Sequence, residues 1–238
     1  MAKKYIFILS HMRSYSSLLG HILGSHSQID GYCEAHLSYS SSADLLKLQE
    51  FVRSSIEQEP LGDFLFDKIL GNHTKIAMKI LEDEKVYPVF LIRNPQDTVK
   101  SILNMGYNIV GNSTYQNVQK VCTEYVKRIR KLALTASKIS GRGLFISSED
   151  LIENTDQVLR RLERFLNLSS PLSSEYRTFK YTGEKSYGDP SSNIATGKVI
   201  KKINIYDGIQ IPKVFNAYIA LNFLIWKKYL ERHCLKNC

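Results

Sequence analysis

Two short segments of the sequence gather residue types that bind anions. In residues 10–17, Arg13 stands among several serines, directly after the apolar run of residues 5–9. A loop that leaves a buried strand and opens a helix presents backbone N–H groups, which bind phosphate or sulfate together with the helix dipole. Arg13 adds a charge-assisted donor that can hold two anion oxygens. A serine N-cap that only starts the helix is the simpler alternative.

The second segment, residues 93–101, reads Arg-Asn-Pro-Gln-Asp-Thr-Val-Lys-Ser. Arg93 follows the apolar run 86–92, and Pro95 suits the first turn of a helix that would carry Ser101. Ligands of parallel sheets bind at the carboxyl ends of strands, so Arg93 and Ser101 can hold a second phosphate. A structural ion pair at Arg93 and a solvent-facing Ser101 explain the same residues.

Together these segments resemble the signatures of sulfotransferases that use 3′-phosphoadenosine 5′-phosphosulfate, in a form similar to the bacterial members. The family's Arg-Ser-Gly-Ser/Thr-Ser/Thr-Leu-Leu matches residues 13–19, and its Arg-Asp-Pro-x-Asp-x-x-x-Ser matches residues 93–101. Residues 146–152 resemble the family's Tyr-Glu-Asp-Leu segment, and residues 188–190, Gly-Asp-Pro, resemble a loop of bacterial members. The resemblance covers most of residues 5–198.

Two departures from the family pattern matter. Tyr15 stands at the glycine of the first loop, where a bulky residue changes the loop path or lies outward beside the acceptor. Ser148 stands where the family usually has tyrosine, which indicates a relaxed structural contact rather than lost chemistry.

The resemblance implies a set of donor-binding residues. The loop after the first strand is expected to hold the 5′-phosphosulfate, the second segment the 3′-phosphate, and a later basic loop to fold over the nucleotide. These expected residues are Arg13, Ser14, Tyr15, Ser16, Ser17, Arg93, Ser101 and Lys198. Arg13 is also expected to stabilise the charge on the leaving oxygen. Lys75 and Lys79 are further cations that can reach the donor, although a solvated strand edge explains them as well.

Sulfuryl transfer to a hydroxyl needs a group that removes the proton. In several branches of the family a Glu at the place of Glu34 is the base, so the resemblance implies this role for Glu34. His36, two residues on, is the rival catalytic base, and His11 lies near the phosphosulfate loop. A surface carboxylate in a turn is the alternative for Glu34.

Two other functions fit parts of the sequence. A kinase-like phosphotransferase would use ATP, but a Walker A loop needs Gly-Lys-Ser/Thr, and the one Gly-Lys pair is followed by Val199. A non-catalytic nucleotide or nucleic-acid binding module fits the charge, which is +9 overall and falls on residues 101–238. Because no known nucleic-acid motif is present, we expect no nucleic-acid partner.

The surrounding pattern predicts an α/β fold with three layers and a central parallel sheet of four or five strands. We expect strands at residues 5–9, 75–81, 86–92 and 144–146, and helices at residues 43–70, 114–139, 154–168 and 212–232. Residues 181–198 are rich in Gly, Ser, Asp and Asn and predict a long loop. Residues 1–238 are expected to form one sulfotransferase-like domain.

The remaining expectations concern environment and partners. No CxxC pair and no His/Cys cluster with zinc spacing occurs, so we expect no metal, no disulfide framework and a cytoplasmic location. No apolar run is long enough to span a membrane. The acceptor is expected to be a hydroxyl of a carbohydrate, a lipid or another small molecule, and the sequence leaves its identity and the oligomeric state open.

Overall fold

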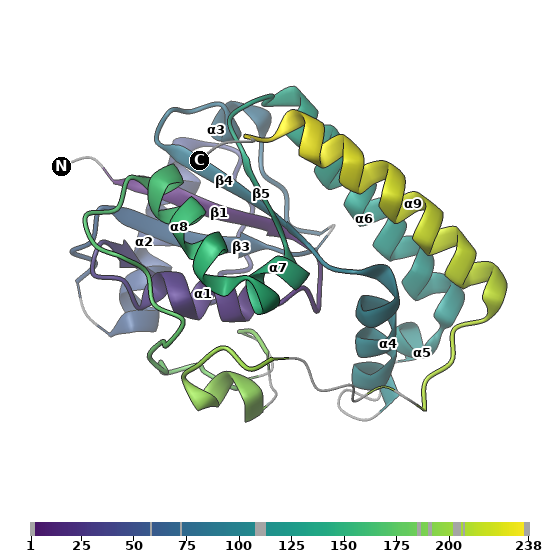
Figure 1. Ribbon diagram of the computed structural model, residues 1–238. Helices are drawn as coiled ribbons and strands as arrows, with labels where there is room; N and C mark the ends of the chain where they lie inside the picture. Colours follow the sequence, from purple (N-terminus) through teal and green to yellow (C-terminus); the bar gives the residue numbers. More distant parts are fainter. Residues whose placement is uncertain are drawn as a thin grey trace.

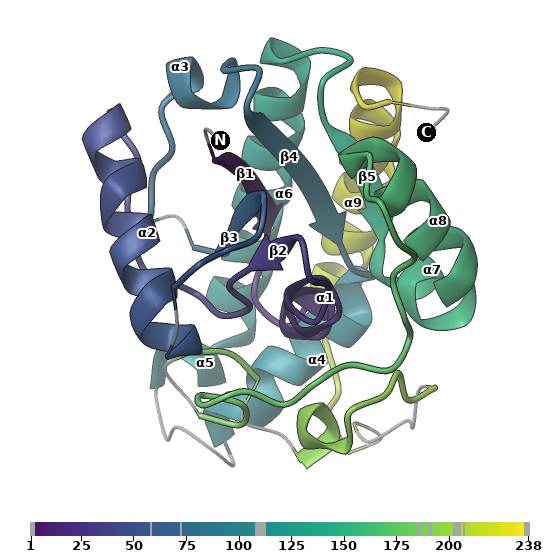
Figure 2. The ribbon, with the colours of Figure 1, turned by 90° about the vertical axis from the view of Figure 1, so that its left-hand side faces the viewer.

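The computed structural model describes residues 3–57, 59–71, 73–107, 113–184, 187–189, 192–201, 206 and 208–235. At its centre lies a sheet of five parallel strands in the order β2-β3-β1-β4-β5. The strands are β1 (Lys4–Ser10), β2 (Ile29–Asp30), β3 (Phe64–Ile69), β4 (Val86–Ile92) and β5 (Leu144–Ser147). Helices lie on both sides of this sheet (Figures 1 and 2), as the predicted three-layer α/β architecture requires.

The two faces of the sheet carry separate hydrophobic cores. One core includes α1 (Ser16–Gly24), α7 (Ser148–Glu153) and α8 (Thr155–Leu166); the other includes α2 (Ser42–Ile56), α4 (Pro95–Met105), α6 (Val118–Lys138) and α9 (Lys213–His233). Along β1, Ile6 and Ile8 enter the first core and Phe7 and Leu9 the second, because successive side chains of a strand point to opposite faces. Short elements α3 (Met78–Leu81), α5 (Ser113–Gln116) and η2 (Ser192–Thr196) complete the described structure.

The structure corrects two predicted elements. The helix predicted over residues 43–70 is right only as far as Ile56, because residues 64–69 form β3. This strand is buried along its whole length. A short segment that is buried on both faces lacks the alternation of apolar and polar residues by which a strand is distinguished from a helix in a sequence. The strand predicted over residues 75–81 is also wrong: Ile76 makes a single bridge with Tyr39, and α3 follows.

The other predicted elements are confirmed with small changes at their ends. The helix predicted over residues 114–139 is divided into α5 and α6, and α6 begins after Asn117, whose side chain accepts from the Lys120 N–H. Asn94 caps α4 in the same way, and Pro95 is its first residue, as predicted. In the predicted loop 181–198, residues 185, 186, 190 and 191 lie outside the described residues.

A crevice is expected between the carboxyl ends of β1 and β4. These two strands are neighbours in the sheet, but β1 leads into α1 on one face and β4 leads into α4 on the other. Neighbouring strands whose connections diverge in this way form a topological switch point, the usual ligand site of open α/β sheets. The two segments that the sequence marks as candidate anion-binding loops are the ones that follow these two strands.

Arg128 on α6 holds the carboxyl ends of β1 and β3 together. Its Nε donates to the Ser10 carbonyl at 2.7 Å and its Nη2 donates to the Ile69 carbonyl. The Arg128 side chain is buried. If it were removed, both carbonyls would lose their hydrogen-bond donor, and bulk water could not replace it. Arg128 therefore fixes the strand ends from which the site is built.

Arg128→Met should lower the free energy of unfolding by about 3 kcal/mol, because it leaves two buried carbonyl groups unpaired. Urea denaturation measures this loss. Lys138→Met is the matched control, since Lys138 is exposed on the same helix and its replacement should change stability by less than about 0.5 kcal/mol. Equal stability of the two variants would contradict a structural role for Arg128.

Candidate functional site

The loop between β1 and α1 has an unusual backbone. Arg13 and Tyr15 both adopt the left-handed conformation, with φ of 61° and 62°. A tyrosine in this conformation costs about 1 kcal/mol relative to glycine. Tyr15 is the N-cap of α1, but its side chain makes no capping hydrogen bond, so the cap does not consume the N–H groups of the first turn. The start of α1 therefore keeps the geometry that an anion site at a helix end requires.

Arg13 joins the two segments that the sequence singled out. Its Nε donates to Ser101 Oγ at 2.9 Å, and Tyr206 Oη donates to the same oxygen at 3.0 Å. Its Nη1 forms an ion pair with Asp189 Oδ1 at 3.0 Å. Burial alone would lower the pKa of Arg13, but Asp189 and Tyr206 raise it above its usual value. Arg13 therefore remains a cation between the loops that follow β1 and β4.

Arg93 and Tyr15 support each other. The Arg93 guanidinium lies 4.5 Å from the centre of the Tyr15 ring, and its Nη1 donates to the Arg13 carbonyl at 3.0 Å. A cation over an aromatic ring gains about 0.5–2 kcal/mol, which offsets the backbone cost of the tyrosine. The ring thus lies beside Arg93, and Arg93 is held against the loop that contains Arg13.

The third family-like segment, around residues 146–152, holds the other two in place. Ser148 Oγ donates to the Ser14 carbonyl at 2.7 Å, and Glu149 Oε1 accepts from the Asn94 N–H at 2.8 Å. Ser148, which stands at the usual tyrosine position, is therefore a structural contact to the first loop.

Lys68 is a site residue that sequence reasoning missed. It lies on β3, only 1% exposed, and its Nζ donates to Ser17 Oγ at 3.0 Å. Burial lowers its pKa, while the carboxylates of Glu34, Asp67 and Asp189 oppose that shift. A buried cation at the first turn of α1 is well placed to meet an anion.

Lys68 was hidden by the wrong assignment of β3 to a helix. The usable signal was a lysine inside the run Phe-Leu-Phe-Asp-Lys-Ile, since lysine is almost never buried without a charge partner. The lysines that the sequence did suggest are exposed: Lys75 lies beside the Tyr39 bridge, and Lys79 lies on α3, before the amino end of β4. Lys79 thus lies near the amino end of β4 and away from its carboxyl end.

Glu34 is largely buried and sits beside cations. Its side chain is 14% exposed, and its Oε1 lies 3.5 Å from His36 Nδ1. Burial raises the pKa of Glu34 above its usual value, opposed by Lys68, His36 and Arg128 in that order. His36 is 55% exposed. A carboxylate with a raised pKa is suited to accept a proton.

Asp67 positions the backbone next to Glu34. Its Oδ1 accepts from the Ala35 N–H at 2.9 Å, and its Oδ2 accepts from Tyr39 Oη. The Glu34 N–H donates to the Tyr187 carbonyl at 3.3 Å. The segment that carries Glu34 is therefore tied on one side to β3 and on the other to the loop before Asp189.

His11 is a structural residue in this geometry. Its Nδ1 donates to the Met12 carbonyl at 2.9 Å and its Nε2 accepts from the Arg93 N–H at 3.0 Å. Burial lowers the pKa of His11 to about 3, with Arg128 and Arg93 adding to the effect. Both nitrogens are thus engaged by the protein, and the ring is neutral at ordinary pH.

The other expected donor residues are placed as follows. Ser14 Oγ is bonded within the loop, to Ser10 Oγ at 2.6 Å and to the His11 carbonyl at 2.7 Å, so its side chain shapes the loop. Ser16 is the buried first residue of α1. Lys198 is held by its backbone, in a bridge with Glu175, and these contacts do not bring it to Arg13.

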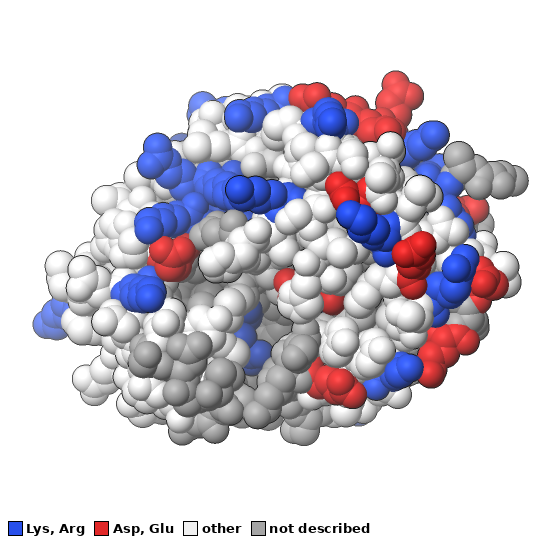
Figure 3. All heavy atoms as spheres, turned by 180° about the vertical axis from the view of Figure 1, so that it is seen from behind, with Lys and Arg blue, Asp and Glu red and all other residues white. Residues whose placement is uncertain are grey.

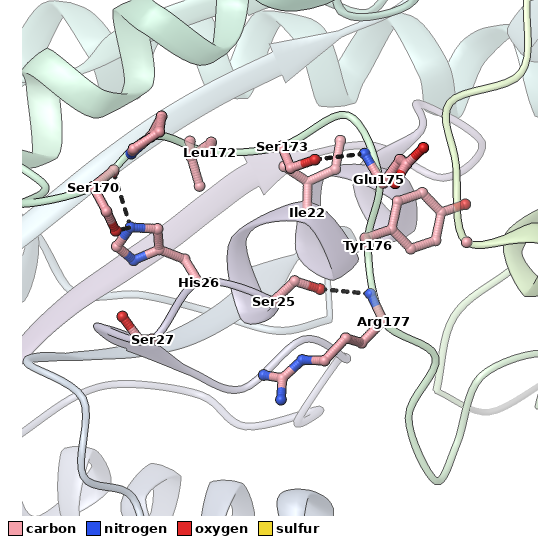
Figure 4. A pocket seen from close by; sticks show the side chains of 12 residues that line it. Ile22, Ser25, His26, Ser27, Ser170, Leu172, Ser173, Glu175, Tyr176 and Arg177 are labelled. Carbon is pink, nitrogen blue, oxygen red and sulfur yellow. Dashed lines mark hydrogen bonds between the residues drawn. The ribbon is translucent and has the colours of Figure 1, made fainter.

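A separate groove of about 640 Å³ lies at the other end of α1. Figure 4 shows it between the end of that helix and residues 170–177, where Ser25 Oγ accepts from the Arg177 N–H and His26 contacts Ser170. None of the predicted site residues lines it. Among the described residues, no group of three or more His, Cys, Asp or Glu side chains could hold a metal ion.

Comparison with known proteins identifies the fold. No protein-family model matches the sequence, and no curated protein matches it. The sulfotransferase domain from the curacin biosynthetic pathway superposes with a TM-score of 0.63 at 19% identity, covering 94% of this chain and 98% of that one. The sulfotransferase from Alicyclobacillus acidocaldarius gives 0.57 at 13% identity, covering 97% and 95%.

Mouse sulfotransferase SULT7A1, solved in complex with PAP, is a further structural neighbour. Its TM-score is 0.56 at 12% identity, covering 97% of this chain and 90% of that one. The chain therefore has the fold of the sulfotransferases, along almost its whole length.

The Asp189 carboxylate competes with any anion that binds Arg13. Asp189→Asn should therefore tighten the binding of inorganic pyrophosphate about fivefold, the equivalent of about 1 kcal/mol for a partly exposed ion pair. Isothermal titration calorimetry measures the change. Asp156→Asn, on the first turn of α8, is the control and should leave binding unchanged. Weaker binding to Asp189→Asn would show that Asp189 supports the anion site instead of competing for it.

Proposed function

We propose that the protein is a sulfotransferase that moves a sulfuryl group from 3′-phosphoadenosine 5′-phosphosulfate to a hydroxyl acceptor. The observation that carries this proposal is the contact between Arg13 and Ser101. It joins the loops after β1 and β4, the two segments that resemble the donor-binding signatures, at the switch point of a sulfotransferase fold. The PAP complex of a structural neighbour is consistent with a donor of this type.

In this proposal the donor is held by two groups of residues. The N–H groups that open α1, with Arg13, Ser16 and Ser17, bind the 5′-phosphosulfate, and Lys68 reaches it through Ser17. Arg93 and Ser101 bind the 3′-phosphate. Ser14 shapes the loop, and the Tyr15 ring positions Arg93. Lys198 would have to approach from the later loop when the donor binds.

The donor supplies an activated sulfuryl group, and the residues of this chain handle the proton and the charge. Glu34 takes the proton from the acceptor hydroxyl as the new oxygen–sulfur bond forms. The bond between sulfur and the phosphate oxygen breaks, and the negative charge left on that oxygen is stabilised by Arg13 and Lys68. The acceptor is a hydroxyl of a carbohydrate, a lipid or another small molecule. A cytoplasmic location remains a prediction from the cysteine pattern.

Recognition of both phosphates can be tested with the bisphosphate product. Adenosine 3′,5′-bisphosphate should raise the melting temperature more than AMP or ATP at the same concentration, because only it fills both phosphate sites and ligands stabilise the state they bind. In the Ser101→Ala variant, the shift in melting temperature caused by the bisphosphate should be close to the shift caused by AMP. Ser54→Ala, exposed on α2, serves as the control. Equal shifts with AMP and the bisphosphate in the unmodified protein would refute the assignment of Arg93 and Ser101.

Glu34→Gln should reduce turnover by a factor of about 100 to 10,000, because it keeps the shape of the side chain and removes its basicity. The thermal shift caused by the bisphosphate should be almost unchanged. Since burial raises the pKa of Glu34, the acid limb of the pH–rate profile should lie above the usual 4.5, with activity falling as the pH drops through it. Transfer of a labelled sulfuryl group to an aliphatic alcohol measures the turnover and its pH–rate profile.

His36→Ala is the matched control for this experiment. His36 is exposed beside Glu34, so its loss should cost much less turnover. If Glu34→Gln retained near-normal turnover while His36→Ala abolished it, His36 would be the base and Glu34 a structural residue.

A further inference from the structure

The outer face of α9 is apolar and exposed to solvent. Val214, Tyr218, Leu221, Leu224 and Ile225 are each at least 41% exposed, and Val214 reaches 70%. With 3.6 residues per turn these five positions fall within an arc of about 120°, about 16 Å long. The opposite face of the helix, with Ile219 and Leu230, is buried in the core. We call the five exposed residues the α9 stripe.

Charge is absent along the α9 stripe and concentrated at its ends. Residues 214–226 contain no charged side chain, whereas Lys213 precedes them and Lys228 and Arg232 follow on exposed positions. Tyr218 carries the only polar side-chain group of the stripe. The stripe is thus apolar between Lys213 at one end and Lys228 and Arg232 at the other, where Lys227 also pairs with Glu231 at 3.8 Å.

The neighbouring helix α6 extends this basic border. Apart from the buried Arg128, α6 and α9 carry nine Lys and Arg residues at exposed or partly exposed positions against Glu124 and Glu231, a net surface charge of +7. The Arg130 guanidinium on α6 lies 5.7 Å from the Trp226 ring on α9, so the two surfaces are contiguous. Seen from behind, Lys and Arg gather over the side on which α6 lies (Figure 3).

We propose that the α9 stripe docks on an anionic lipid surface, with the helix lying in the plane of the interface. An apolar arc bordered by Lys and Arg is the pattern of helices that insert one face between lipid headgroups while their cations meet the anionic lipids. No helix of the described residues is long and apolar enough to cross a membrane. The packing of α9 on α6 also keeps the other face of the helix out of the lipid.

A second copy of the chain fits this surface less well. An antiparallel pairing of two α9 helices would bring the Lys213 end of one against the Lys228 and Arg232 end of the other, and a parallel pairing would oppose the cations directly. Like charges brought together in this way are destabilising. An acidic protein partner would satisfy the cations, but protein interfaces carry a hydrogen bond for about every 100–200 Å², and the stripe offers only the Tyr218 hydroxyl.

Vesicle co-sedimentation of the whole protein tests the proposal. Vesicles of phosphatidylcholine with phosphatidylglycerol should bind the protein at low salt at least tenfold more tightly than phosphatidylcholine alone. Leu221→Glu/Ile225→Glu should reduce binding to the anionic vesicles at least tenfold, since both residues are exposed and their replacement leaves the core intact. Lys228→Glu/Arg232→Glu should weaken it similarly. Leu46→Glu, at a leucine 62% exposed on α2, is the matched control and should bind normally.

Three results would overturn the proposal. The first is no binding to anionic vesicles, and the second is binding that Leu221→Glu/Ile225→Glu leaves unchanged. The third is a dimer in analytical ultracentrifugation that the same double variant dissociates, which would assign the stripe to a second copy. Because lipid binding is measured directly, the outcome does not depend on sulfuryl transfer.

Discussion

The buried ammonium group of Lys68 is the constraint around which the site is arranged. Removing a lysine from water is unfavourable unless opposite charges and hydrogen bonds replace the lost solvent. Glu34, Asp67 and Asp189 supply the charges, and Ser17 accepts the hydrogen bond. Asp67 also binds the backbone beside Glu34, so compensating the lysine fixes the position of the carboxylate. One desolvated cation is thus linked both to the first turn of α1 and to the segment that carries Glu34.

The three family-like segments depend on one another in the same way. Arg93 braces the first loop through the Arg13 carbonyl and the Tyr15 ring, and Ser148 braces it through the Ser14 carbonyl. These are contacts between parts of the chain more than 75 residues apart. The left-handed Tyr15 is tolerated because its neighbours stabilise it.

Sequence reasoning picked out the loops after β1 and β4 but missed other residues that lie with them in the structure. The carboxyl ends of β1 and β4 were predictable because each strand is an apolar run followed by Arg and polar residues. β3 was not, because a run buried on all sides has the same pattern in a strand and in a helix, and Lys68 was missed with it. The ion pair between Arg13 and Asp189 joins residues 176 positions apart, and no local pattern encodes such a contact. Whether residues 1–238 act as one domain stays a prediction.

The single tryptophan of the chain, Trp226, lies where α9 meets α6, with Arg130 over its ring and Tyr229 at 5.9 Å. Intrinsic tryptophan emission therefore reports on the interface between these two helices and not on the loops at the carboxyl ends of β1 and β4. A melting curve followed by this fluorophore records when α9 separates from α6. Signals that follow the many tyrosines instead average over the whole sheet and its loops.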